Sequence, residues 1–86
     1  MKIIYHRNFT KTFLKLTIKQ QNRIIEAITD FQNNPFDPIL KNHALHGDQK
    51  NRRAFSVGGD LRIVYEEENN YTVVTFYRVG THNQVY

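Results

Sequence analysis

A hairpin signal in the second half of the chain constrains the fold more than any other feature of the sequence. In the stretch RRAFSVGGDLRIVYEEE, residues 52–68, two strand-like runs flank the pair Gly58-Gly59, a pattern typical of two strands joined by a tight turn. A further strand-like run, YTVVTFYRV at residues 71–79, follows a short polar tip. Because strands joined by short turns pair antiparallel, the sequence predicts a mostly antiparallel sheet.

The first third of the chain predicts one strand followed by two helices. Residues 2–5 (KIIY) have the character of a short strand, and Asn8 is a candidate helix cap. A polar stretch at residues 17–23 interrupts the helical period, and Pro35 ends it. Apolar stripes with helical spacing lie on both sides of the polar stretch: Phe9, Phe13 and Leu16 before it, and Ile24, Ile28 and Phe31 after it.

The predicted fold is therefore α+β, with a short N-terminal strand and a helical hairpin packed on one face of a four- to five-stranded, mostly antiparallel sheet. A chain of 86 residues has room for one hydrophobic core. We expect a single domain over residues 1–86. The residues after Gly80 are expected to form either a last short strand or a tail lying across the sheet.

Strand parity predicts an arginine-bearing face on the side of the sheet away from the helices. Alternate side chains of a strand point to opposite faces, so Phe55 and Ile63 belong to apolar sets that can pack on the helices. The opposite parity gathers Arg52, Ser56 and Arg62 on the open face. Such a face is a candidate binding site for phosphate groups.

Composition favours a soluble protein that meets polyanions. Twelve Lys and Arg against eight Asp and Glu give a net charge of +4, and excess positive charge attracts nucleic acid. The chain has no cysteine, which fits a reducing compartment. No segment approaches the roughly 20 apolar residues of a membrane span. We therefore expect a cytoplasmic protein without membrane contact.

A row of basic residues recurs every four positions in the first helical region: Arg7, Lys11, Lys15 and Lys19. Like charges at this spacing destabilise a helix by about 0.2–0.5 kcal/mol per pair. Two interpretations stay open from charge alone. The row is either a solvated helix face or a surface for a polyanionic partner.

The candidate chemical groups are histidine, aspartate, arginine and tyrosine. His43 and His46 in NHALHG lack a third ligand, so neither a metal nor another cofactor is expected. The glycine pair lacks the pattern of a nucleotide-binding loop, and no serine or cysteine nucleophile motif is present. The remaining groups suffice for RNA cleavage, in which a base deprotonates the 2′-OH, an arginine stabilises the phosphorane and an acid protonates the 5′-oxygen.

Two places in the sequence can supply these groups. Asp60, after the glycine turn, is either a turn residue or a partner that orients an imidazole, and Arg62 offers a planar donor fork to a phosphate. The chain ends on RVGTHNQVY, residues 78–86, which carries His82 and Tyr86. An aromatic ring at that end can stack on a base and hold an RNA backbone in line for attack.

The order of these motifs resembles the RelE/ParE superfamily of bacterial toxin–antitoxin toxins, and most of all its YafQ-like branch. The resemblance covers essentially the whole chain and includes NHALHG, the hairpin with Asp60 at its turn, and the terminal VGTHNQVY. It implies a ribosome-dependent endoribonuclease that cuts mRNA on the 70S ribosome. It also implies inhibition by a small antitoxin in a hetero-oligomer.

The resemblance assigns expected roles to individual residues. It implies five catalytic residues: His43, Asp60, Arg62, His82 and Tyr86. It leads us to expect substrate binding by Lys50, Arg52, Arg53 and Ser56. Contacts with the ribosome or the antitoxin are expected of Lys11, Lys15 and Lys19. His46 has no family counterpart and is left without a role.

One departure from the family pattern keeps other functions open. Ser56 occupies the position of a second family histidine, and serine is no acid or base near neutral pH. The acid/base pair would then be His43 and His82, or one of these with substrate-assisted help. The alternatives are a ParE-like poison of DNA gyrase, and a basic RNA- or protein-binding module that has lost catalysis. On the catalytic reading, a chain that ends at Thr81 is expected to fold but not to cleave.

Overall fold

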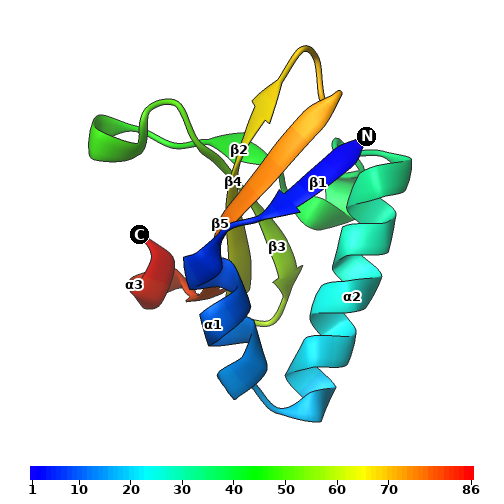
Figure 1. Ribbon diagram of the computed structural model, residues 1–86, viewed down its shortest axis with the longest axis vertical. Coiled ribbons are helices and arrows are strands. Elements are labelled where there is room, and N and C mark those ends of the chain that lie inside the picture. The colour runs from blue at the N-terminus through cyan, green and yellow to red at the C-terminus, as the bar shows by residue number, and fades with distance from the viewer.

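The computed structural model describes residues 1–86 and has an α+β fold (Figure 1). Its elements are β1 (Lys2–Tyr5), α1 (Arg7–Lys15), α2 (Ile18–Asn33), the 3-10 turn η1 (Pro38–Leu40), β2 (His43–Ala44), the 3-10 turn η2 (Gly47–Gln49), β3 (Arg53–Gly58), β4 (Leu61–Glu68), β5 (Val73–Thr81) and α3 (His82–Val85). None of the helices has the length and apolar character needed to cross a bilayer.

The five strands form one mixed sheet in the order β1-β5-β4-β3-β2. β1 runs parallel to β5, and every other neighbouring pair is antiparallel. The N-terminal strand, the helical hairpin and the mostly antiparallel sheet predicted from the sequence are confirmed. The structure adds a third helix, α3, at the C-terminus.

The helix α1 begins directly after His6, and the predicted cap at Asn8 is wrong by two residues. Nδ1 of His6 accepts a hydrogen bond from the backbone N–H of Asn8 at 3.1 Å. This bond satisfies one of the four N–H groups that a helix start leaves without a partner. The sequence pattern missed it because histidine is not among the usual capping residues.

The predicted break between the two helices lies at Leu16 and Thr17, at the start of the polar stretch, and residues 18–23 form the first turns of α2. Thr17 and Gln20 form a capping box, in which the Gln20 N–H donates to Thr17 Oγ1 at 3.1 Å and the Thr17 N–H donates to Gln20 Oε1 at 3.0 Å. Lys19 therefore lies on α2. It does not continue the basic row of α1, which corrects the predicted row of four.

The hairpin of α1 and α2 packs on one face of the sheet and encloses the main core. Phe31 of α2 lies at its centre, with its ring centroid 4.5 Å from that of Phe55 and 4.9 Å from that of Tyr65. Ile63 belongs to the same buried cluster. The apolar sets that strand parity assigned to the helices are thus confirmed. Burial of each large apolar side chain stabilises the fold by about 1.5–3 kcal/mol. This stabilisation fixes which face of the sheet points outward.

The outward face is partly covered by α3, which corrects the expectation of a helix-free face. The residues after Gly80 lie across the sheet, as one of the two expectations had it, but they form a helix there. Val85 of α3 is only 2% exposed and packs on Ala54 and Val64, which point away from the main core. Ser56 and Arg62 are paired across β3 and β4 on this same face. Figure 1 shows α3, at the red end of the chain, on the side of the sheet away from α2.

Candidate functional site

Tyr86, the last residue, brings two distant histidines to one place. The rings of Tyr86 and His82 lie edge-to-face on α3 with centroids 4.4 Å apart. Tyr86 Oη also lies 3.4 Å from Nε2 of His43 on β2. All three side chains are exposed. The structure therefore gathers the predicted acid/base groups around one accessible phenol.

The hydrogen bonds of His43 define its tautomer. Nδ1 lies 3.0 Å from the backbone carbonyl oxygen of Lys41, and a carbonyl can only accept, so Nδ1 carries the proton of the neutral ring. Nε2 is then left with its lone pair and faces the hydroxyl of Tyr86. His43 is thus oriented to take up a proton at Nε2.

The surroundings of Tyr86 keep its hydroxyl protonated. Burial raises the pKa of Tyr86 above its ordinary value, and the positive charge of Arg62 opposes part of this rise. The phenol is therefore a hydrogen-bond donor at neutral pH. Arg62 lies two residues before Val64 on β4 and therefore projects from the outward face of the sheet that α3 covers.

Arg62 is anchored through a single nitrogen. Nη1 donates to Ser56 Oγ at 3.3 Å, to the carbonyl of Gly59 at 3.1 Å and to its neighbour's carbonyl at 3.0 Å. Its Nε and Nη2 form no hydrogen bond within the protein. Arg62 therefore presents a fixed guanidinium with free donors, and Ser56 serves as one of its supports.

Two predicted site residues lie apart from this cluster. Asp60 is exposed in the turn between β3 and β4 and forms no hydrogen bond with either histidine. Arg53 points to the helix side, where its Nε donates to Asn42 Oδ1 at 3.0 Å and its guanidinium lies 5.5 Å from the ring centroid of Phe36. No three His, Cys, Asp or Glu side chains lie together as a metal site would require.

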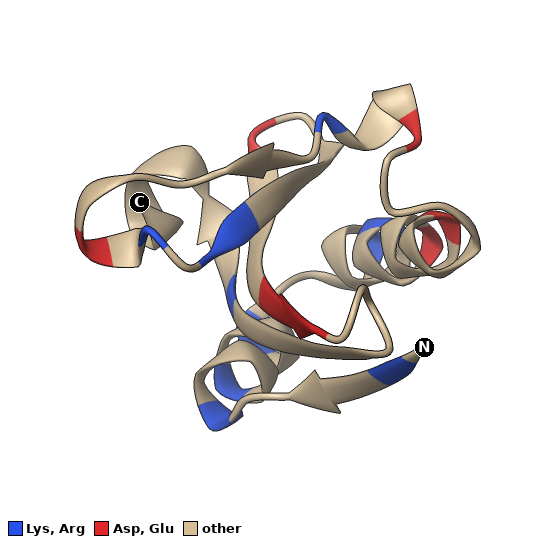
Figure 2. Ribbon diagram, turned by 90° about the horizontal axis from the view of Figure 1, so that it is seen from above, with Lys and Arg blue, Asp and Glu red and all other residues tan.

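Two shallow grooves flank α3, and basic residues line both. The first, here called the loop groove, measures about 690 Å³ and is lined by residues 47–52 together with Glu66, Arg78 and Tyr86. The second, the α1 groove, measures about 610 Å³ and includes Lys11 and Lys15 of α1 and again Arg78. Figure 2 shows basic segments on α1 and on the loop beside the C-terminus.

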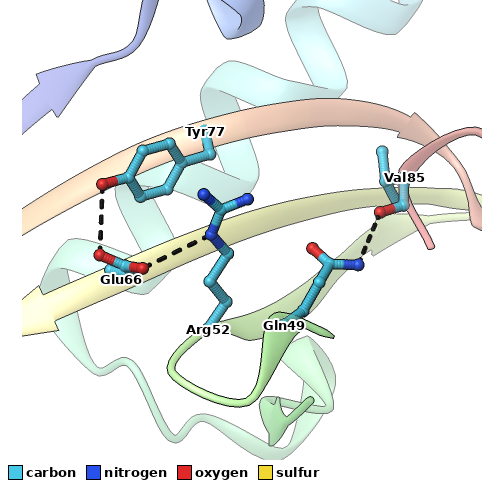
Figure 3. Close-up of polar contacts among 5 residues, drawn as sticks. All are labelled: Gln49, Arg52, Glu66, Tyr77 and Val85. Atoms are coloured by element: carbon cyan, nitrogen blue, oxygen red, sulfur yellow. Dashed lines mark hydrogen bonds and ion pairs between the residues drawn. The ribbon is translucent and has the colours of Figure 1, made fainter. Parts of the chain in front are cut away.

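Arg78 and Gln49 are site residues that the sequence did not single out. Arg78 is exposed and borders both grooves. Gln49 ties the loop to α3, because its Nε2 donates to the carbonyl of Val85 at 3.3 Å (Figure 3). Its Oε1 is buried without a hydrogen-bond partner. No local pattern in the sequence signals a bond between residues so far apart in the chain.

Glycine at position 80 allows α3 to start where it does. Gln84 folds back so that its Oε1 accepts a hydrogen bond from the Thr81 N–H at 2.9 Å. A Cβ at position 80 would lie 2.7 Å from that same Oε1 and 3.2 Å from the Gln84 Cβ. A residue with a side chain at position 80 therefore cannot coexist with this cap unless Gln84 moves.

The variant Gly80→Ala is expected to lose the bond between Gln84 and Thr81 and to detach α3. We expect the free energy of unfolding to fall by about 1 kcal/mol, the usual contribution of a helix cap. NMR should show loss of the nuclear Overhauser contacts between Tyr86 and His43. Asn83→Ala, on the exposed side of α3, is the matched control and should keep them; equal contacts in both variants would contradict this role of Gly80.

Comparison with known protein families gives one match that spans the chain. The family described as "Bacterial toxin of type II toxin-antitoxin system, YafQ" matches residues 1–86. No curated protein matches the sequence of the chain.

Solved structures show the same fold. YafQ from Escherichia coli strain BL21(DE3) is 27% identical, with a TM-score of 0.80 over 99% of this chain and 97% of that one. YafQ in the E. coli DinJ–YafQ toxin–antitoxin complex is 27% identical, with a TM-score of 0.76 over 99% and 96%. A chain of the archaeal RelE–RelB complex from Pyrococcus horikoshii shares the fold at 15% identity, with a TM-score of 0.75 over 98% and 97%.

Proposed function

The chain belongs to the YafQ family of bacterial toxins of type II toxin–antitoxin systems, and from that premise we propose that it is a ribosome-dependent endoribonuclease that cleaves mRNA. The observation that carries the proposal is the contact of Tyr86 with both His43 and His82, on the face of the sheet from which the Arg62 guanidinium projects. A protein that only binds a partner has no need of two imidazoles gathered at an anion-binding group. The arrangement supports acid/base chemistry on a phosphodiester.

His43 is the proposed general base. Its Nε2, whose lone pair faces the Tyr86 hydroxyl at 3.4 Å, takes the proton of the ribose 2′-OH once the substrate displaces that contact. The O2′–P bond then forms, and negative charge grows on the non-bridging oxygens of the phosphorane. Arg62 stabilises that charge with its free Nε and Nη2 donors, which are already in position before the reaction.

His82 is the proposed general acid. In its imidazolium form it gives a proton to the 5′-oxygen while the P–O5′ bond breaks, so that the products are a 2′,3′-cyclic phosphate and a 5′-hydroxyl. Tyr86 holds the neighbouring base by stacking. Each histidine ends in the opposite protonation state and exchanges its proton with solvent before the next turnover.

The proposed partners are a small antitoxin, the 70S ribosome and mRNA. The E. coli YafQ structure in a toxin–antitoxin complex supports the antitoxin, which would hold the toxin inactive in a hetero-oligomer in the bacterial cytoplasm. Lys11 and Lys15, which line the α1 groove with Arg78, form a surface that suits either ribosomal RNA or an acidic antitoxin segment.

Induction of the protein in bacterial cells, followed by mapping of mRNA 5′ ends, tests the proposed function. The wild-type chain is expected to produce cuts in phase with codons, and the double variant His43→Gln/His82→Gln is expected to produce none at equal expression. Growth arrest with intact message would contradict the proposal. DNA damage under the same conditions would favour the gyrase-poison alternative.

A further inference from the structure

A β-bulge in β5 places two consecutive side chains on the outward face of the sheet. Tyr65 pairs with Phe76 and Val64 pairs with Arg78, so Tyr77 is an extra residue without a partner on β4. Phe76 lies in the main core, whereas Tyr77 and Arg78 both point to the opposite side. Bulges redirect side chains in this way and are frequent beside active sites.

The redirected Tyr77 forms a compact group with Arg52 and Glu66 (Figure 3). The Arg52 guanidinium carbon lies 4.2 Å from the centroid of the Tyr77 ring, and Arg52 Nε lies 3.5 Å from Glu66 Oε1. The Tyr77 hydroxyl donates to Glu66 Oε2 at 3.2 Å. A ring, a planar cation and a carboxylate thus hold one another in fixed orientation.

This group is accessible from the loop groove. The side chains of Arg52 and Glu66 are 29% and 37% exposed, and both line the groove together with Lys50, Arg78 and Tyr86. At about 690 Å³ the groove falls in the size range of small-molecule sites. Since Tyr86 belongs both to the groove and to the histidine cluster, a nucleotide next to the scissile phosphate would enter this groove.

We propose that the loop groove is a subsite for one nucleobase of single-stranded RNA, with a preference for guanine. The Arg52 guanidinium, supported from behind by Tyr77, is a stacking platform for the base. Each Glu66 oxygen already accepts one bond, from Arg52 or from Tyr77, and keeps a second lone pair. Guanine presents two adjacent donors, N1–H and N2–H, to these two oxygens. Lys50 and Arg78 bind the flanking phosphates. The inference rests on the proposed function, because it takes RNA as the substrate.

Chemistry distinguishes guanine from the other bases at such a carboxylate. Adenine and cytosine present one amino group beside a ring acceptor, and uracil presents one N–H between two acceptors, so each places an acceptor against a Glu66 oxygen. Discrimination by a bidentate contact to a base edge amounts to about 5- to 150-fold in affinity. The subsite is therefore expected to alter which sequences are cut as well as how tightly RNA binds.

The test uses binding of uncleavable RNA, so that it does not depend on catalysis. The probes are the 2′-O-methyl tetranucleotides UUGU, UUAU and UUUU, titrated at low salt. The wild-type chain is expected to bind UUGU about 10-fold more tightly than UUUU. Glu66→Gln should abolish this preference, and Arg52→Ala should weaken the binding of every probe about 10-fold. Glu26→Gln, on the exposed surface of α2, removes the same charge outside the groove and should match the wild type.

The outcomes separate this proposal from the proposed function. Equal affinity of the wild-type chain for the three probes would overturn the subsite, whether or not any variant folds. Unchanged preference in a folded Glu66→Gln variant would overturn the role of Glu66 even if the wild type cleaves message in cells. The wild-type chain could also prefer guanine, lose this preference in Glu66→Gln, and yet leave message intact in cells. That combination would support the subsite and contradict the proposed nuclease activity.

Discussion

Substitution of Arg62 by alanine is expected to lower the rate of message cleavage by about 10²–10³-fold, the usual effect of removing one preorganised donor from a developing anion. The loss should be large because Nη1 of Arg62 is held by three oxygens, including Ser56 Oγ, so the free donors face the substrate without reorganisation. Primer extension on translating ribosomes measures the rate. Thermal unfolding should change little, since Arg62 lies outside both buried clusters.

Lys2→Ala is the matched control for Arg62→Ala. Lys2 is exposed on β1 and lines neither of the two grooves beside α3, so its loss lowers the net charge equally without touching the site. Equal reductions in the two variants would mean that Arg62 acts only through the overall charge of the protein. Ser56→Ala should fall between them, because it removes one support of the guanidinium and leaves two.

Local patterns in the sequence were enough to predict the elements of the sheet and the residues of its outward face. Gly58-Gly59 supplies the positive φ angles of the turn, 132° and 55°, that other residues rarely adopt. The strand period of two then fixed the side on which Ser56 and Arg62 lie, and the structure pairs them across β3 and β4. The period works here because one face is fully buried, so a slip by one residue would expose the core.

The two-residue strand period did not predict the faces of β5, where a bulge changes the register of pairing with β4. Both parities of the last strand are partly apolar, and the bulge at Tyr77 sends Tyr77 and Arg78 to one face. Arg78 was missed for that reason. Arg53 was expected to bind substrate together with its neighbour Arg52, which points outward. Arg53 instead has the parity of Phe55, points to the helix side and binds Asn42. A basic residue that is adjacent to a site residue in the sequence need not be close to the site in space.

The end of the chain combines a local signal with tertiary contacts. Thr81 and Gln84 have the spacing of a capping box, which indicates a helix start that the sequence prediction overlooked. The bond from Gln49 to the Val85 carbonyl and the burial of Val85 hold this helix on the sheet, and neither appears in a local pattern. That a chain ending at Thr81 folds stays a prediction, and such a chain would lose the packing of Val85. Deletion of residues 82–86 would expose Ala54 and Val64, so point variants of the histidines are the sounder test of their roles.

The two histidines are expected to respond differently to a sulfur atom at the cleaved bond. In a short message on 70S ribosomes, sulfur replaces the bridging 5′-oxygen at the mapped cut site. A thiolate leaves without protonation, so it no longer needs a general acid. On the all-oxygen message, His43→Gln and His82→Gln should each cleave about 10²–10⁴-fold more slowly than the wild type.

On the sulfur-containing message, His82→Gln should recover to near the wild-type rate, whereas His43→Gln should stay slow. The reason lies in the tautomer of His43, whose Nδ1 is bound to the Lys41 carbonyl so that Nε2 can only take up a proton from the 2′-OH, a step that sulfur does not replace. Recovery of His43→Gln in place of His82→Gln would exchange the two roles. If neither variant recovered on the sulfur-containing message, His82 would not be the general acid. It would then act by holding Tyr86 against the substrate, since the two rings are in contact.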